Sequence, residues 1–365
     1  MKFTIKQIGL LTTVAICASL ISCANVVTGQ ALSEDDKKYD YYYQNISKEN
    51  QRVYEQLYEG LTSCQENIVL ENAKGIDISI ITKALCTDHP ELAYFKGGGA
   101  LKNIPMLDVA VFTPDYSTTN VDEALKTKER VKNFISNIAD HTPKGSDYDK
   151  ALYIYDYISD RTRFDKDTLG GEYKNIVSLI DNQAAVCDGY ADATLMALHK
   201  VGIEAFSIMG ESKVDDVYEA HKWICAKLDG EWCFIDTTWG DNKVNHYDYF
   251  GLTSEEINKD HFADKSQTIV PIPECTSKAA NYYVRNNMIL SGEEALELIY
   301  KLKPGEKLSF MCDSEESYNE IHRKFAEKGG DLYTQIAKNN GKLEKITLEF
   351  YENDELHSFQ VEIAK

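Results

Sequence analysis

Apolar residues recur three or four positions apart in the middle of the chain, and this spacing predicts amphipathic helices. One predicted helix is centred on Val131, Ile135 and Ile138. Ser146 is a residue type that favours helix starts, and it precedes a second apolar face that continues over residues 151–158. These two helices are predicted to open the core of the protein.

The pattern changes in the segment that follows. Residues 191–200 predict a further helix, and residues 203–209 predict a strand. Two short runs rich in Trp, Ile and Phe, His221–Leu228 and Glu231–Asp236, flank Asp229-Gly230, a dipeptide that strongly signals a two-residue hairpin. Helices followed by antiparallel strands predict an α+β fold class, in which helix 191–200 packs on the sheet.

The chain divides into five predicted segments. They are a leader at 1–22, a polar, flexible tether at 23–36, a small α/β region at 37–115, the core at 116–272 and a small α/β module at 273–365. The polar residues 211–219 are predicted to form a loop at the rim of the site. In the C-terminal module, the predicted elements are strands at 307–311, 347–351 and 359–363 and a helix at 315–328.

Cys187 precedes helix 191–200 and is expected at or near the N-terminus of that helix. Unpaired backbone N–H groups at a helix start create a positive potential, which stabilises a thiolate relative to a thiol. The same N–H groups can receive an oxyanion. Taken alone, Cys187 is equally compatible with the commoner role of an inert buried cysteine.

The hairpin brings a histidine and a carboxylate together. With a two-residue turn, Leu228 faces Glu231, and counting back along the strands places Trp223 opposite Asp236. His221 and Trp223 share one face, so His221 and Asp236 become diagonal neighbours. A carboxylate beside a histidine fixes its tautomer and stabilises the imidazolium. A thiol at a helix start together with this pair predicts nucleophilic catalysis.

Three motifs in this order resemble those of the transglutaminase-like superfamily (the transglutaminase core), which is related to papain-type cysteine enzymes: Cys187-Asp188-Gly189-Tyr190-Ala191, His221-Lys222-Trp223 and Asp236-Thr237-Thr238-Trp239. Ala185 departs from the glycine that the family often has two residues before the thiol. Residues 249–253, together with Asp260-His261, also resemble bacterial members. The resemblance covers about residues 120–270 and implies a papain/transglutaminase-like core.

By this resemblance, Cys187 is the nucleophile, His221 is the general base and acid, and Asp236 orients the imidazole. The implied reaction is acyl transfer from a peptide or protein amide, through a thioester, to an amine or to water. Peptidase-like hydrolysis, including hydrolysis of a cell-wall peptide, stays open. The side chain that completes the oxyanion hole stays open between Gln183 and Trp239. This chemistry requires no cofactor.

The first residues predict an export signal. Lys2 and Lys6 precede an apolar stretch at 8–21 that is short for a membrane span. Its end, Leu20-Ile21-Ser22-Cys23, resembles a bacterial lipobox, which implies cleavage before Cys23 and lipid attachment to its thiol. The alternative is an ordinary secretory peptide with an incidental cysteine. Both predict an extracytoplasmic protein, and the first attaches it to the bacterial cell membrane by lipid alone.

Composition adds two constraints. The chain has 39 Lys and Arg against 59 Asp and Glu, a net charge of −20 that becomes −22 without the two leader lysines. Such a chain should be repelled by nucleic acid, so no nucleic-acid partner is predicted. Apart from Cys17, Cys23 and Cys187, six cysteines remain, which permits disulfides without requiring them. Cys225 and Cys233 should point to opposite faces of the hairpin and are not expected to pair.

No metal site is predicted, because Asp215-Asp216 and Asp241 match no ligand loop and the sequence lacks a Cys-x-x-Cys pair. Two non-enzymatic interpretations stand beside the cysteine enzyme. In one, the protein is a surface binding lipoprotein with a catalytically silent core. In the other, the protein is a scaffold whose terminal regions bind carbohydrate or protein. The intact Cys–His–Asp set favours the enzyme.

Overall fold

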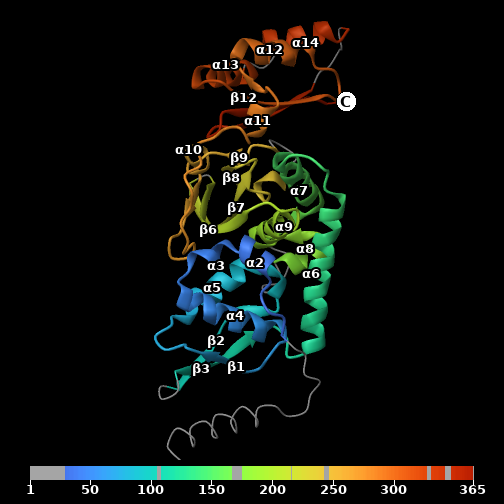
Figure 1. Ribbon diagram of the computed structural model, residues 1–365. Helices are drawn as coiled ribbons and strands as arrows, with labels where there is room; N and C mark the ends of the chain where they lie inside the picture. The colour runs from blue at the N-terminus through green and yellow to red at the C-terminus, as the bar shows by residue number, and fades with distance from the viewer. Residues whose placement is uncertain are drawn as a thin grey trace, which may run out of the picture.

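The computed structural model describes residues 29–104, 108–166, 175–214, 216–241, 246–326, 330–341 and 347–364. The described chain is elongated, with three bodies stacked in sequence order (Figure 1). The N-terminal region (blue to cyan) lies at one end, the core (green to yellow) in the middle and the C-terminal module (orange to red) at the other end. The long helix α6 (Val121–His141) runs beside the first two bodies.

A five-stranded antiparallel sheet forms the centre of the core, in the order β10-β6-β7-β8-β9. Its strands are β6 (Ala205–Val214), β7 (Val217–Leu228), β8 (Glu231–Ile235), β9 (Phe250–Leu252) and β10 (His261–Ala263). Asp229 and Gly230 connect β7 to β8 with φ angles of 50° and 94°, as the predicted two-residue turn requires. The predicted α+β arrangement is confirmed.

Helices cover one face of this sheet. They are α6, α7 (Asp147–Arg161), α8 (Ile176–Asn182) and α9 (Cys187–Lys200). Ser146 caps α7 as predicted, because its hydroxyl accepts the N–H of Asp149. Ile138 and Leu198 from the helices join Ile224 from the sheet in one buried cluster. Since α9 contacts both β6 and β7, the helix that begins with the thiol packs on the sheet.

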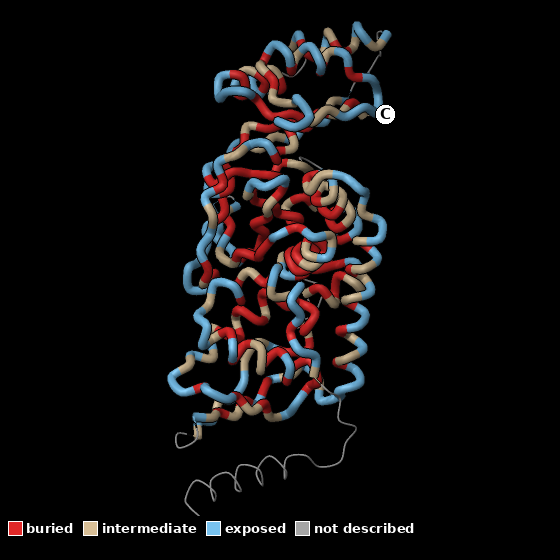
Figure 2. Tube along the Cα trace, in the orientation of Figure 1, coloured by how far each residue is buried: buried red, intermediate tan, exposed pale blue. Residues whose placement is uncertain are grey.

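The N-terminal region covers the opposite face of the sheet. It comprises α2 (Glu34–Tyr39), α3 (Tyr41–Asn45), α4 (Lys48–Thr62), α5 (Ile78–Asp88) and a sheet of β1 (Ile68–Glu71), β3 (Val109–Tyr116) and β2 (Phe95–Ile104), in that order. Leu57 and Leu85 share one buried cluster with Phe206, Ile208 and Trp223 of the central sheet (Figure 2). Residues 37–115 are therefore mixed α/β, but their core is continuous with that of the central sheet.

The predicted flexible tether is wrong for its described part, residues 29–36. Leu32 is buried, and α2 begins at Glu34. Ser33 and Asp36 form a capping box that fixes the start of this helix. A polar composition therefore does not mean flexibility here, because the polar side chains serve as helix caps. These residues belong to the folded N-terminal region.

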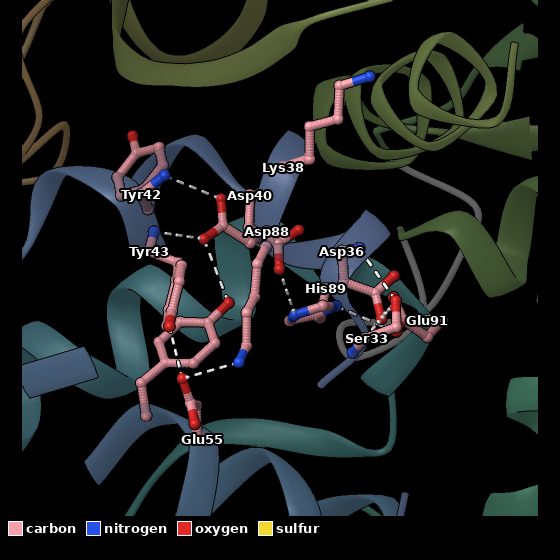
Figure 3. Close-up of polar contacts among 12 residues, drawn as sticks. Ser33, Asp36, Lys38, Asp40, Tyr42, Tyr43, Glu55, Asp88, His89 and Glu91 are labelled. Carbon is pink, nitrogen blue, oxygen red and sulfur yellow. Dashed lines mark hydrogen bonds and ion pairs between the residues drawn. The ribbon is translucent and has the colours of Figure 1, made fainter. Parts of the chain in front are cut away.

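A buried polar cluster joins α3 to the end of α5 (Figure 3). The Asp88 carboxylate accepts two backbone N–H groups at the start of α3, at 2.8 and 3.1 Å. The adjacent His89 ring lies between two further acids, 3.1 Å from Asp40 and 3.2 Å from Glu91. All four side chains are buried. The cluster therefore caps α3 and pairs a histidine with carboxylates inside the N-terminal region.

The C-terminal module has its own core, which includes Ile299, Phe310 and Phe359. Its elements are β11 (Ile289–Leu290), α12 (Gly292–Lys301), β12 (Lys307–Cys312), α13 (Glu315–Ala326), α14 (Asp331–Asn339), β13 (Leu348–Asn353) and β14 (Ser358–Ile363). The sheet order is β11-β12-β14-β13. The four predicted elements occur with shifted ends. Cys275 and Tyr283 pack into the first core cluster, so the module begins later than the predicted residue 273.

The predicted loop at 211–219 is wrong. β6 and β7 continue through most of this segment as a projecting hairpin, with Val214 opposite Val217. Val214, Val217 and Tyr218 are more than half exposed there. A strand that projects into solvent does not need an apolar face, so its sequence lacks the alternation that normally identifies strands. Two short helices, α10 (Ser254–Ile257) and α11 (Tyr282–Arg285), follow β9 and β10 along the chain.

The seven cysteines in the described part of the chain are all free thiols. Cys225 and Cys233 are not bonded to each other, as predicted, and the register pairs Cys233 with Ala226 instead. Cys17, Cys23 and the leader lie outside the described residues. Among the helices that the structure describes, none has both the length and the apolarity needed to cross a membrane.

Candidate active site

Cys187 is the first residue of α9, where the sequence places it. The preceding short strand β5 (Ala184–Ala185) pairs with β4 (Arg163–Phe164) and leads the chain into the helix. Gly189 allows this entry, because a Cβ atom there would lie 2.5 Å from Ala185 Cβ and 2.8 Å from a backbone oxygen. The Cys187 side chain is partly exposed and lines a cleft. A thiol at this position receives the positive potential of the helix N-terminus.

His221 and Asp236 meet as the predicted register requires. The β7–β8 pairing runs from Leu228 opposite Glu231 to Ile224 opposite Ile235, so the next residues on the two strands are Trp223 and Asp236. The Nε2 atom of His221 lies 2.7 Å from Oδ2 of Asp236. Both side chains are buried. The hairpin therefore fixes the imidazole–carboxylate pair.

Asp236 is the most heavily hydrogen-bonded carboxylate of the site. Oδ1 accepts the N–H groups of Thr238 at 2.8 Å and Trp239 at 3.3 Å. Oδ2 accepts a hydrogen bond from Nε2 of His221, and Nε2 of His261 lies 3.0 Å from the same oxygen. Burial alone would favour the neutral acid, but these histidines outweigh it and hold the pKa of Asp236 well below its ordinary value. Asp236 is therefore ionised over the whole physiological pH range.

The Asp236 carboxylate makes His221 a strong base. Burial favours the neutral ring, but the charge of Asp236, its hydrogen bond and a hydrogen bond with Cys187 together raise the pKa of His221 to about 9. Because Nε2 is bonded to Asp236, Nδ1 is the nitrogen left for the thiol. The three sequence-predicted side chains are thus connected in the order thiol, imidazole and carboxylate.

His261 is the residue of this site that the sequence did not identify as functional. Its ring lies at the start of β10, which pairs with β6 on the edge of the sheet. The rings of Trp239 and Trp223 pack against it, with centroids 4.6 and 5.0 Å away. The sequence contained only a resemblance of the segment around Asp260-His261 to bacterial relatives. Proximity to Asp236, 25 residues earlier, arises from the sheet order.

Lys222 is a second unpredicted feature of the site. Its buried Nζ lies 2.5 Å from Oδ1 of Asp192 and 3.9 Å from Oδ1 of Asp188. Asp188 directly follows Cys187 in the sequence. Burial opposes the charged form, but Asp192, Asp188 and the Cys187 thiol raise the pKa of Lys222. A buried cation is therefore held beside the residues that begin α9.

A cleft of about 1650 Å³ opens at the Cys187–His221 pair. Trp239 lines it, as one candidate oxyanion donor should, whereas Gln183 lies exposed in a left-handed turn after α8, outside the described lining. The projecting hairpin of β6 and β7 forms another part of the wall. Eleven Asp or Glu residues and four Lys residues line the cleft. Its charge therefore favours a cationic ligand.

The C-terminal module also reaches this cleft, through residues 351–355 of the β13–β14 hairpin. Asn353 Nδ2 and Ser358 Oγ lie 3.0 and 2.7 Å from Oδ2 of Asp248, a buried core residue. Asp248 also accepts the Tyr283 hydroxyl at 2.7 Å. Burial raises the pKa of Asp248 to about 6, although these hydrogen bonds oppose the shift. The module is thus hydrogen-bonded to the core beside the cleft.

The acids considered as metal ligands have other partners. Asp241 accepts the Tyr190 hydroxyl and the Phe164 N–H, and Asp216 pairs with Lys213. Asp215 lies outside the described residues. Ligand atoms of His221, Asp236 and His261 lie within 4.8 Å of one another, and two hydrogen bonds to one carboxylate oxygen account for that closeness.

One family model matches part of the core. Residues 136–237, which include Cys187, His221 and Asp236, match the family model of the Transglutaminase-like superfamily, so the chain carries a domain of this superfamily. No curated protein matches the chain.

Solved structures resemble parts of the chain at low identity. A TGase aligns with a TM-score of 0.29 and 18% identity over 39% of this chain and 44% of its own. A proposed cysteine protease from Cytophaga hutchinsonii aligns with a TM-score of 0.29 and 14% identity over 47% of this chain and 71% of its own. The periplasmic domain of TgpA from Pseudomonas aeruginosa gives a TM-score of 0.24 and 14% identity, over 36% and 55%. The chain therefore spans less than half of the first of these structures.

Proposed function

We propose that this transglutaminase-like domain is a cysteine enzyme that transfers the acyl group of a peptide or protein amide through a thioester on Cys187. The observation that carries the proposal is that Cys187, at the start of α9, lines the same cleft as His221, whose ring lies 2.7 Å from Asp236 Oδ2. The thiol faces an open cleft rather than the packed core.

The first half-reaction forms the thioester. The Cys187 thiolate attacks the amide carbonyl carbon, and the carbonyl electrons move to oxygen. Backbone N–H groups at the start of α9 are in position to receive this oxyanion. The His221 imidazolium then gives its Nδ1 proton to the amide nitrogen, the C–N bond breaks, and the amine or ammonia leaves. Asp236 holds the ring in the required tautomer throughout.

The second half-reaction releases the acyl group. Neutral His221 takes a proton from the incoming water or amine, whose lone pair attacks the thioester carbon. The C–S bond breaks, and the thiolate and imidazolium are restored. Water yields a carboxylic acid, whereas an amine yields a new amide. The cleft carries more acidic than basic side chains, which favours an amine that is protonated when it first binds and that loses this proton to solvent before its lone pair attacks.

A glutamine peptide with a labelled primary amine separates the two outcomes. Incorporation of the amine identifies transfer, and release of acid or a cleaved peptide without incorporation identifies hydrolysis. A diamine and a hydroxyl-bearing monoamine of similar size should be compared, because the diamine carries one more positive charge and an acidic cleft predicts preference for it. C187A is the control, and an acyl adduct on Cys187 found by mass spectrometry with cell-envelope extract identifies the substrate.

The competing function is a surface binding protein with a silent core. Alkylation of Cys187 by iodoacetamide distinguishes the two, since a thiol activated by His221 should react at neutral pH faster than a free model thiol. A rate equal to that of the model thiol would favour the binding protein. The alternative scaffold is tested by deleting residues 290–365 and measuring binding to cell envelopes.

We further propose that the protein acts outside the cytoplasm, attached to the bacterial cell membrane by lipid on Cys23. The support is the charged and apolar pattern of residues 1–22 and the lipobox-like Leu20-Ile21-Ser22-Cys23. Mass spectrometry of the mature N-terminal peptide should find diacylglycerol on Cys23. A mature peptide with an unmodified thiol would leave only secretion, and an intact leader would contradict both.

A further inference from the structure

A second imidazole contacts Asp236, and the proposed reaction does not use it. Nε2 of His261 lies 3.0 Å from Asp236 Oδ2, the same oxygen that bonds His221. The other ring nitrogen, Nδ1, lies 2.5 Å from Oδ1 of Asp260. The ring is fully buried. Both nitrogens of His261 therefore face carboxylate oxygens.

The hydrogen-bond partners determine the protonation of His261. An ionised carboxylate only accepts hydrogen bonds, so two such partners require a proton on each ring nitrogen. The second oxygen of Asp260 accepts the Tyr249 hydroxyl at 2.5 Å. Burial opposes a charged ring, but the hydrogen bonds and charges of Asp236 and Asp260 raise the pKa of His261. We therefore treat His261 as a buried imidazolium.

Aromatic rings hold this imidazolium in one orientation. Trp239, Trp223 and Tyr249 pack around it, with ring centroids 4.6, 5.0 and 5.5 Å away. The ring centroids of His221 and His261 are 5.1 Å apart. Two cations so close in a buried site repel each other, and both are stabilised by the same Asp236 oxygen.

We propose that His261 is a positioning residue, which holds Asp236 in place and weakens the attraction of that carboxylate for the proton on His221. The inference rests on the proposed function, because its consequence is easier proton release from His221 to the leaving amine. The charged or titratable groups that face the His261 ring among the described residues are Asp236 from the end of β8, Asp260 before β10, His221 from β7 and Tyr249 before β9.

The test is a pH titration of histidine ring nitrogens by NMR, with selective ¹⁵N labelling of the full purified protein. H221Q and H261Q identify the two resonances. In the wild type, His221 should titrate at about 9, and the two carboxylate contacts of His261 predict the signal of a doubly protonated ring at pH 7. In H261Q, the amide can still donate to Asp236 but carries no charge, so the titration of His221 should move upward by about one pH unit.

Matched variants separate positioning from packing. H261F keeps a ring but removes both donors, and it should lower the alkylation rate of Cys187 more than H261Q does. H199Q changes another histidine, whose Nε2 contacts the Ala205 carbonyl oxygen away from the cleft, and it should leave the His221 titration unchanged. If H261F does not fold, H261Q still decides, because it retains a donor to Asp236.

An unchanged or lower titration of His221 in H261Q would overturn the inference, as would a neutral ring of His261 at pH 7. The proposed function has a separate readout, the acyl adduct on Cys187. A shifted titration without any adduct would support the role of His261 and contradict the enzyme. An acyl adduct on Cys187 without a shifted titration of His221 would support the enzyme and contradict the role of His261.

Discussion

The protein contains two buried clusters of histidine and carboxylate, and their chemistry differs. In the N-terminal cluster, one ring, His89, contacts two acids, with Asp88 adjacent (Figure 3). In the cluster of the candidate active site, one acid, Asp236, receives two rings, and one of these rings, His261, also contacts Asp260. Burial raises the pKa of Asp40 to about 6, despite His89, and raises that of Asp88 well above its ordinary value. The pKa of Asp236 is instead lowered.

The two imidazoles bonded to Asp236 explain this difference, because Asp88 also accepts two backbone N–H groups and the Tyr54 hydroxyl, yet its pKa is raised. Asp236 has two backbone N–H groups and two imidazoles, so its negative charge is stabilised although it is buried. Asp40 shares a single histidine with Glu91. Of the two described clusters, the one around Asp236 reaches the cleft that holds Cys187, through His221, whereas the one around His89 does not line it. Buried histidine–acid contacts alone therefore do not indicate an active site, and the ionised acid close to a thiol in a cleft is what supports the proposed one.

Removing the nucleophile should have the largest effect. C187A is expected to abolish the acyl adduct and turnover, with a loss of at least about 10³-fold. Because Cys187 is only partly buried, the free energy of unfolding should change by less than about 1 kcal/mol. Single-turnover assays and thermal unfolding measure the two quantities. Turnover that persists in C187A would show that Cys187 is not the nucleophile, and the cluster around Asp236 would then have no demonstrated role in catalysis.

The matched pair D236N and D88N compares the two clusters directly. D236N keeps the shape but presents an amide to His221, so we expect the rate to fall by about 10³- to 10⁴-fold. D88N should leave the rate per folded molecule within about twofold, because Asp88 caps α3 and is not among the residues that line the cleft. Equal losses in the two variants would show that the clusters are not functionally distinct.

H89Q tests stability rather than chemistry. It leaves Asp40 and Glu91 buried without their cation, and we expect a loss of about 3 to 5 kcal/mol in the free energy of unfolding. The pKa of His89 is raised above its ordinary 6.5, so its contribution to stability is complete below pH 6.5 and is lost as the pH rises through the raised value. Denaturant unfolding from pH 5 to 10 measures this. If H89Q loses as much stability as the wild type does when the pH is raised to 10, the role of His89 is contradicted.

The smallest effect is expected where the C-terminal module joins the core. N353A and S358A each remove one hydrogen bond to Asp248, and each should cost about 1 kcal/mol of stability. Alkylation of Cys187 should slow by no more than a few fold, because Asp248 does not contact the catalytic groups. The change is read from alkylation and thermal unfolding in parallel, with S309A in the same module as the control.

The sequence sufficed for the groups whose geometry is local. Cys187 follows from a helix start, and the His221–Asp236 pair follows from one two-residue turn and the alternation of strands. His261 could not be derived in this way, because its contact with Asp236 depends on β10 pairing with the far side of β6. The wall contributed by residues 351–355 depends on how the module docks, which local spacing does not encode.

The larger boundaries show the same limit. The hydrophobic pattern along the sequence predicts a boundary between residues 37–115 and the core. In the structure no such boundary divides the buried side chains, because Leu57 and Phe206 belong to one hydrophobic cluster. Hydrophobic periodicity identifies which face of an element is buried but not which partner covers it. The segment 211–219 was predicted as a loop for the related reason that a projecting strand needs no buried face.

The central sheet is covered on both faces, and this has a practical consequence for any shortened form of the protein. A fragment that starts at residue 116 would contain every group of the Cys–His–Asp set, yet would leave Phe206, Ile208 and Phe234 facing water. Such a fragment should self-associate through the uncovered face. The N-terminal region keeps this apolar face of the central sheet away from water, so any shortened form of the protein that is to stay monomeric should include it.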